Sequence, residues 1–146
     1  MNRRGFILLE VLLGMFLLGI ISVTFFPIIN SAQNNLYLLE TKNDMKYFAE
    51  TVLERIKAFE FDSENDEYIL DMRLKILMER FCRETTAEVE LPIFDREEYK
   101  YLIKINKINQ NENLWKIRVN ITSKENSERI KDVVLEAYIP KPKRKR

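Results

Sequence analysis

Residues 6–29 read FILLEVLLGMFLLGIISVTFFPII, an apolar run in which Glu10 is the only charged side chain. A helix of this length at about 1.5 Å per residue measures roughly 36 Å, enough to cross a hydrocarbon core of about 30 Å. The run therefore predicts a transmembrane helix. A secretory signal peptide is the alternative, but it needs a shorter apolar core and a small-residue cleavage site, of which residues 30–32 (Asn-Ser-Ala) are a poor version.

Basic residues flank this run unequally. Arg3 and Arg4 precede it, and the next Lys or Arg is Lys42. Because positive charge near a span stays on the cytoplasmic side, we expect the N-terminus in the cytoplasm and residues 30–146 outside. The predicted location is thus the cell membrane, as a single-pass protein with an external head.

Glu10 is the residue in this run that needs a reason. A carboxylate at the centre of a membrane helix costs about 2.5–3.5 kcal/mol or more, and intramembrane acids usually mark function. Glu10 lies near the cytoplasmic end, which lowers that cost. The alternative is a tolerated interfacial glutamate that reaches the headgroups or is protonated.

The residues around Glu10 resemble a known signal. Arg3-Arg4-Gly5, then Phe6 and three apolar residues, then Glu10 and a long apolar run are similar to the class III signal of type IV prepilins and type II secretion pseudopilins. The resemblance implies that a prepilin peptidase cuts between Gly5 and Phe6 and N-methylates Phe6. Glu10 is then the fifth residue of the mature chain and an assembly residue.

Two later positions agree with the same family, and one departs from it. Gly19 and Pro27 match the glycine and proline that bracket the family's locally melted helix segment. Pro27 also removes one backbone hydrogen bond and is expected to kink the helix. Ile7 departs, since the family usually has Thr or Ser after the phenylalanine.

Cleavage gives Glu10 a physical role. The new ammonium at Phe6 lies near hydrocarbon, where a carboxylate of an adjoining subunit would neutralise it, and such a pair is far stronger than in water. Neither charge is well solvated alone, so pairing favours entry of the helix into a stack and sets its register. Glu10 could also pair with its own Phe6, because residues four apart are helical neighbours.

Past residue 29 the apolar residues follow the i, i+3, i+4 spacing of one helical face. They are Met45, Phe48, Ala49, Val52, Leu53, Ile56 and Phe59. No Gly or Pro separates residues 28 and 61, so the span is expected to continue as one helix to about residue 60. Its apolar stripe needs a partner, and a β-sheet built from the rest of the chain is the natural candidate.

The remainder predicts a small α+β head. Leu70, Leu74, Leu77 and Phe81 repeat at helical spacing, which predicts a second helix over residues 67–84, with Cys82 at its end as a buried apolar residue. Apolar residues then alternate with polar ones over residues 101–105, 115–121 and 133–139, which predicts a three-stranded antiparallel meander. Residues 89–91, before Pro92, add a short edge strand. Trp115 and the Tyr and Phe residues are assigned to the core.

Composition excludes most enzyme and cofactor chemistry. The chain has no histidine and one cysteine, and its three glycines lie at positions 5, 14 and 19. A histidine base, a cysteine zinc site and a glycine-rich phosphate loop past residue 19 are therefore ruled out. We predict no enzyme, no catalytic residue, no cofactor and no metal. The acidic residues 62–67 lack the spacing and glycine of an EF-hand loop, so a solvated turn is favoured over calcium.

Charge is unevenly distributed over the chain. Residues 30–140 carry 17 basic and 22 acidic side chains, a net charge of −5, whereas residues 141–146 (KPKRKR, the basic tail) carry +5. A solvated tail is the favoured interpretation, and contact with an acidic neighbour or an anionic polymer is the alternative. DNA is a further possible partner, although the sequence contains no specific DNA-binding motif.

Together these features predict a pilin-like α+β chain. Its parts are a leader (1–5), a transmembrane helix (6–29), an amphipathic continuation (30–60), a head (61–140) and the basic tail. The resemblance implies a minor pilin or pseudopilin of a type IV pilus, type II secretion or competence system. Implied partners are other pilins or pseudopilins, prepilin peptidase, the inner-membrane assembly platform and membrane lipid. The alternative is a signal-anchored binding protein that does not polymerise.

Overall fold

The computed structural model describes residues 3–61, 66–94, 96–125 and 129–142. The chain divides into two units, Met1–Leu39 and Glu40–Arg146, and each is described by itself. Helix α1 (Arg3–Ala58) forms the first unit and continues into the second as its first element. The α+β class, with one long apolar N-terminal helix and a small antiparallel sheet, is confirmed.

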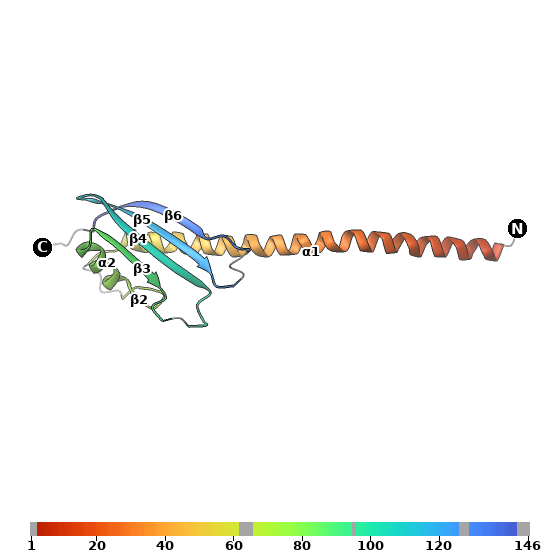
Figure 1. Cartoon of the computed structure of the whole chain (residues 1–146), viewed down its shortest axis with the longest axis horizontal. Helices are drawn as coiled ribbons and strands as arrows, with labels where there is room; N and C mark the ends of the chain where they lie inside the picture. The colour runs from red at the N-terminus through yellow and green to blue at the C-terminus, as the bar shows by residue number, and fades with distance from the viewer. Residues whose placement is uncertain (1–2, 62–65, 95, 126–128, 143–146) are drawn as a thin grey trace. The chain divides into compact units, whose positions relative to one another are not determined.

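The second unit, which we call the head, adds a short hairpin, a second helix and a four-stranded sheet to the end of α1 (Figure 1). The elements in order are β1 (Tyr68–Ile69), β2 (Met72–Arg73), α2 (Leu74–Arg83), β3 (Thr86–Leu91), β4 (Tyr101–Asn111), β5 (Leu114–Ser123) and β6 (Val133–Pro140). β1 pairs only with β2, and the larger sheet has the order β3-β4-β5-β6 with every pair antiparallel. The predicted meander and the strand before Pro92 are both present.

The register of the sheet places the alternating apolar residues on one face. Val89, Ile105, Val119 and Leu135 lie opposite one another across all four strands. The members on β3, β4 and β5 are buried, whereas Leu135 on the edge strand β6 is half-buried. Because side chains alternate between faces along a strand, this row fixes which face of every strand meets the core.

The stripe on α1 covers this face of the sheet, as its spacing predicts. Met45, Ala49, Val52 and Ile56 are at most 1% exposed, and the Phe48 ring lies 6.1 Å from the ring of Tyr101 on β4, measured between centroids. Figure 1 shows the end of α1 running alongside the sheet. The same helix that is apolar all round at its start therefore becomes one-sided where the sheet begins.

Helix α2 closes the other part of the core. Its Phe81 and the β5 residue Trp115 meet edge to face, with ring centroids 6.1 Å apart and an interplanar angle of 88°. Both are almost fully buried, as are Leu74 and Leu77 on the same face of α2. Edge-to-face aromatic pairs add about 0.5–1.5 kcal/mol beyond their area burial, so this pair joins helix and sheet.

The predicted start of the second helix is wrong. Instead of a helix from residue 67, β1 and β2 form a hairpin, and α2 begins only at Leu74. Leu70 has φ 53°, which a right-handed helix cannot contain, and the Asp71 carboxylate accepts hydrogen bonds from the N–H groups of Ile93 (3.0 Å) and Phe94 (2.9 Å). These long-range bonds compensate for the unfavourable φ and override the helical spacing of Leu70.

Three smaller expectations also need correction. Cys82 is half-buried rather than buried and lies one residue before the end of α2. Trp115 is in the core, but several other aromatic side chains are exposed, among them Tyr47 (73%) and Phe94 (67%). Strand β4 extends to Asn111, well beyond the alternating run 101–105 that predicts it. Of the acidic segment and the basic tail, residues 62–65 and 143–146 lie outside the described residues.

A buried lysine lies beneath the aromatic pair. Lys107 occupies an inward position of β4 and is fully buried; its Nζ donates to the carbonyl of Glu84 (2.6 Å), just past the end of α2, and lies 4.9 Å from the centroid of the Trp115 ring. Burial lowers the pKa of Lys107 below its ordinary value, and the positive charge of Lys141 adds to this, against opposing effects of Cys82 and Glu84. The ammonium therefore links the end of α2 to the sheet.

We predict that Phe81→Ala lowers the free energy of unfolding by about 3–5 kcal/mol, because it leaves a cavity against Trp115. Ile76→Ala, on the exposed face of the same helix, is the matched control and should stay within about 0.5 kcal/mol. The measurement is denaturant unfolding of the whole chain in uncharged detergent, followed by the fluorescence of Trp115, the single tryptophan. Equal effects of the two variants would contradict the packing described.

A second prediction concerns how Lys107 makes the stability of the folded chain depend on pH. Because its pKa is lower in the folded chain, the unfolded chain binds more protons just below the ordinary value of 10.5, and stability rises with pH there. The stability of wild type relative to Lys107→Met should therefore increase as pH approaches 10.5 from below.

Circular dichroism during urea unfolding at a series of pH values measures this difference. Lys104→Met is the control, because hydrogen bonds to Glu88 and Glu90 raise the pKa of Lys104. Its contribution to stability is present below 10.5 and is lost only as the pH rises through the raised value. A wild-type advantage over Lys107→Met that falls over the same range would show that the sign is wrong.

Candidate functional site

The first unit presents an uncovered apolar surface. Every large apolar side chain from Phe6 to Ile29 is 49–77% exposed, and none of the most apolar window of α1 is buried. The mean hydropathy of that 18-residue window is 2.6. Contiguous exposed apolar surface of this extent marks an interaction with a membrane or with other chains.

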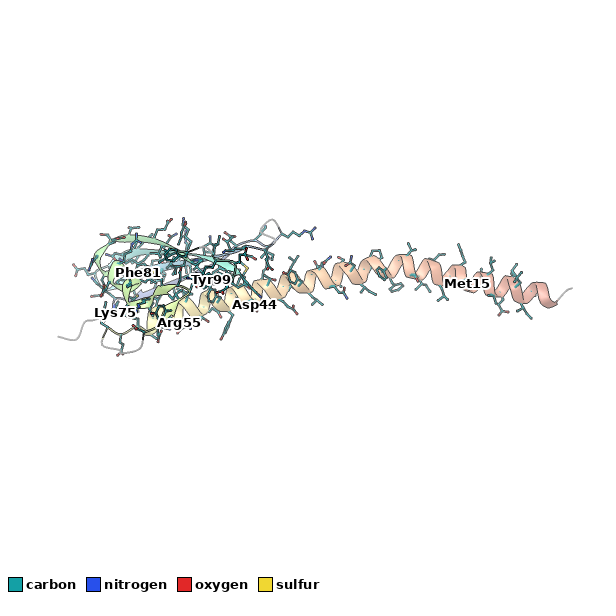
Figure 2. All side chains as sticks on the ribbon, turned by 90° about the horizontal axis from the view of Figure 1, so that it is seen from below. Met15, Asp44, Arg55, Lys75, Phe81 and Tyr99 are labelled. Carbon is teal, nitrogen blue, oxygen red and sulfur yellow. The ribbon has the colours of Figure 1, made fainter. Side chains whose placement is uncertain are left out.

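By length and composition, one helix among the described residues could span a membrane, and this is α1. A buried core helix of a soluble protein can pass the same test, but the exposed side chains distinguish α1 from it. Met15, labelled in Figure 2, is one of these exposed residues, at 70%. The coarse prediction of a membrane-compatible N-terminal helix therefore agrees with the structure, while its orientation stays a prediction.

Ser22 and Thr24, two of the few polar residues in the apolar run 6–29, are hydrogen-bonded within the helix. The hydroxyl of Ser22 donates to the carbonyl of Leu18 (2.8 Å), and that of Thr24 donates to the carbonyl of Ile20. A hydroxyl bonded to the preceding turn does not need water, so both residues suit an apolar environment.

Glu10 is the exception. Its side chain is exposed, and it has no ion-pair or hydrogen-bond partner among the residues whose side chains the structure describes, which begin at Phe6. Phe6 lies four residues earlier, one turn along the same face of α1. The structure therefore brings the predicted assembly residue and the predicted new N-terminus onto one face of the helix.

The predicted cleavage site lies in the first turns of α1. The helix begins at Arg3, so the peptide bond between Gly5 and Phe6 is helical; nothing is described of the side chains of residues 1–5. Helix ends fray, and a glycine weakens the helix further by about 1 kcal/mol relative to alanine. This is therefore a part of α1 that can unwind easily.

Gly19 and Pro27 both lie inside α1, which is helical through each of them. Local melting and a kink at these residues stay predictions. A Cβ added at Gly14 or Gly19 would meet no atom within 4 Å. Neither glycine therefore makes room for another part of the described chain.

The outer face of the sheet offers no free basic patch for nucleic acid in the described residues. Lys104 pairs with Glu88 and Glu90, and Glu136 pairs with Lys116 (2.9 Å) and Arg118. Hydrogen bonds from Lys116 and Arg118 lower the pKa of Glu136. The cations on this face are thus locally neutralised, which does not favour DNA binding there.

Two polar residues hold parts of the head together, and neither of them was identified from the sequence. Lys107 stands at an inward position of the alternating pattern, and that position is the one signal that could have revealed it. The role of Asp71 cannot be recognised from local sequence, because its hydrogen-bond partners lie more than 20 residues away. Its partial burial acts to raise its pKa, but the N–H groups of Phe94 and Ile93 lower it below its ordinary value. No cluster of His, Cys, Asp and Glu suited to a metal occurs among the described residues.

The fold and this site define an α+β chain with a membrane-compatible N-terminal helix and an antiparallel four-stranded head. No family model, no curated protein and no solved structure matches the chain.

Proposed function

We propose that this chain is a pilin-like subunit, of the minor pilin or minor pseudopilin kind, in a type IV pilus, type II secretion or competence pseudopilus system. The observation that carries the proposal is the spacing of Gly5, Phe6 and Glu10 at the start of an exposed apolar helix that continues into a small α+β head. A signal peptide or a plain anchor needs no carboxylate in that position.

In this function the chain is inserted with its N-terminus in the cytoplasm and its head outside. Prepilin peptidase hydrolyses the bond between Gly5 and Phe6 and methylates the new amine. The ammonium at Phe6 and the carboxylate of Glu10 then lie one turn apart on one helix face, where each can meet its counterpart on an adjoining subunit. An ion pair at this depth stabilises one axial register and disfavours the separated helices.

The uncovered surface of α1 supports assembly as well as insertion. Lipid covers it while the subunit is in the membrane, and the same surface must be covered by other subunits once it leaves. Small residues allow helices to approach closely, and Gly14 lies on the face that carries Glu10. The inner-membrane assembly platform and other pilins or pseudopilins are the partners that this transfer requires.

The first prediction from this function concerns processing. In cells that contain prepilin peptidase, the membrane-extracted chain should begin at N-methyl-Phe6, because Gly5 lies at the required distance from Glu10. Mass spectrometry of the N-terminal peptide measures this, and cells without the peptidase are the control. An intact leader, residues 1–5, in peptidase-positive cells would favour the signal-anchored binding protein instead.

The second prediction concerns Glu10. Glu10→Ala should leave insertion and cleavage intact, since it makes the span more apolar, but should impair incorporation into filaments. Leaving the Phe6 ammonium without its partner costs about 3–5 kcal/mol, at least about a hundredfold in association. Glu10→Gln keeps the shape without the charge and should be nearly as defective.

The measurement is the fraction of cleaved subunit in sheared filaments or crosslinked to other pilins. Leu9→Ala controls for lost apolar surface, because it removes an exposed side chain beside Glu10 and leaves the charge; it should lower recovery less than either Glu10 variant. Wild-type recovery for both Glu10 variants would assign Glu10 to the membrane interface and exclude the charge-pairing mechanism.

A further inference from the structure

A groove of about 400 Å³ opens on the head beside α1. α1 contributes Asp44, Tyr47 and Phe48, the segment leading into β4 contributes residues 98–101, and the turn between β1 and β2 contributes Leu70. Asp44 and Tyr99, from two different elements, are labelled in Figure 2. We call this feature the aromatic groove.

Tyrosine and phenylalanine rings dominate the groove. Tyr47 is 73% exposed although it directly precedes Phe48 of the stripe, and Phe48 packs against Tyr101 at 6.1 Å between ring centroids. The face of an exposed tyrosine ring such as that of Tyr47 attracts a cation, whereas Tyr99 and Tyr101 are half-buried. Rings arranged in this way also accept the flat side of a proline or an arginine.

The charged groups of the groove favour a cation. Among the described residues, neither Asp44 nor Glu98 forms an ion pair or a hydrogen bond through its side chain. Lys100 is the opposing charge in the lining, so the groove carries a net charge of −1. Both carboxylates are therefore available to a ligand.

Hydrogen bonds fix two of the segments that line the groove. Leu70, with φ 53°, lies next to Asp71, whose carboxylate binds the N–H groups of Ile93 and Phe94. The segment before β4 is fixed by the Tyr99 N–H, which donates to the carbonyl of Arg96 (3.2 Å), and by the Lys124 ammonium, which donates to the same carbonyl (3.2 Å). A groove ordered before binding loses less entropy when a ligand enters.

We propose that the aromatic groove binds the basic tail, residues 141–146, of a second copy of this chain. The tail reads KPKRKR and carries +5, while residues 30–140 carry −5. Its Lys and Arg side chains match the carboxylates of Asp44 and Glu98 and the exposed ring of Tyr47, and Pro142 favours an extended chain that can lie along a groove.

The topology of the head requires the tail to come from another molecule. Pro140 pairs with Leu114 at the start of β5, and the Lys141 N–H donates to the carbonyl of Asn113 (2.9 Å), so the tail leaves at that end of the sheet. Tyr101, in the groove, pairs with Ser123 at the other end of β5. These ends lie about 30 Å apart at 3.3 Å per residue, whereas the main chain of residues 141–146 reaches about 20 Å.

A tail at one end and a groove at the other form a heterologous contact. Such head-to-tail contacts do not close on themselves as a two-fold interface does, and they generate an open chain of subunits unless a rotation closes a ring. The role of this contact in a filament rests on the proposed function, whereas the contact itself does not and is tested separately.

The test measures binding of a fluorescent peptide of sequence KPKRKR to the otherwise complete chain lacking residues 141–146, in uncharged detergent micelles. Fluorescence anisotropy gives the dissociation constant. We expect Asp44→Asn or Glu98→Gln to weaken binding about two- to fivefold and the double variant about tenfold. Lys100→Gln removes the opposing charge and should strengthen binding about two- to fivefold.

Glu112→Gln is the matched control, because Glu112 is exposed in the turn at the other end of the sheet. A peptide of sequence QPQQQQ tests whether charge is required. Equal affinity for wild type and the Asp44→Asn, Glu98→Gln double variant would overturn the proposal, since the tail would then bind detergent or the general surface. So would a loss of binding in Glu112→Gln as large as in the double variant.

Photocrosslinking in the full chain tests contact between copies. A benzophenone amino acid at Tyr47 should yield a crosslinked dimer that disappears when the five basic residues of 141–146 are changed to Gln. The same probe at Val134, which is exposed on β6 and lies seven residues before the tail, is the control. Dimer formation that does not depend on the tail would contradict the proposal, and an uncleaved leader would contradict the proposed function alone, so the two failures are distinguishable.

Discussion

The continuity of α1 is the constraint on which the rest of this structure depends. One helix, Arg3–Ala58, has exposed apolar side chains over its first half and supplies the innermost residues of the head, such as Met45 and Ala49, from its second half. The sheet cannot cover its own apolar face without that second half. The apolar side chains of the first half are exposed, and apolar surface of that extent marks contact with lipid or with other chains.

Charge is distributed in three different ways along this helix and sheet. On the outer face of the sheet, opposite charges are paired, as at Glu136 with Lys116. In the core, Lys107 is held by a carbonyl and an aromatic ring in place of a carboxylate. At Glu10 and at Asp44 the carboxylates have no partner among the described side chains. Both of these carboxylates lie where contacts with other molecules are proposed.

The sequence predicts the long helix, the meander and the inner face of the sheet. Apolar residues that recur every 3.6 positions in a helix or every 2 positions in a strand indicate which face is buried. The stripe from Met45 to Ile56 and the row through Ile105 and Val119 follow from those periods. The hairpin before α2 could not be predicted, because it depends on hydrogen bonds that the Asp71 carboxylate accepts from N–H groups more than 20 positions later. At the candidate site, spacing alone identifies Gly5, Phe6 and Glu10, whereas the aromatic groove needs three separate elements to meet and has no local signal.

The way α1 enters the head also has a mechanical consequence. A pull along residues 6–39 is transmitted by a continuous run of helical hydrogen bonds to side chains such as Val52 and Ile56 in the middle of the core. Such a load acts in shear on many helix-to-sheet contacts at once instead of peeling strands apart one hydrogen bond at a time. Rupture would then require the whole stripe to slide, so the head is built to resist tension from its own N-terminal helix.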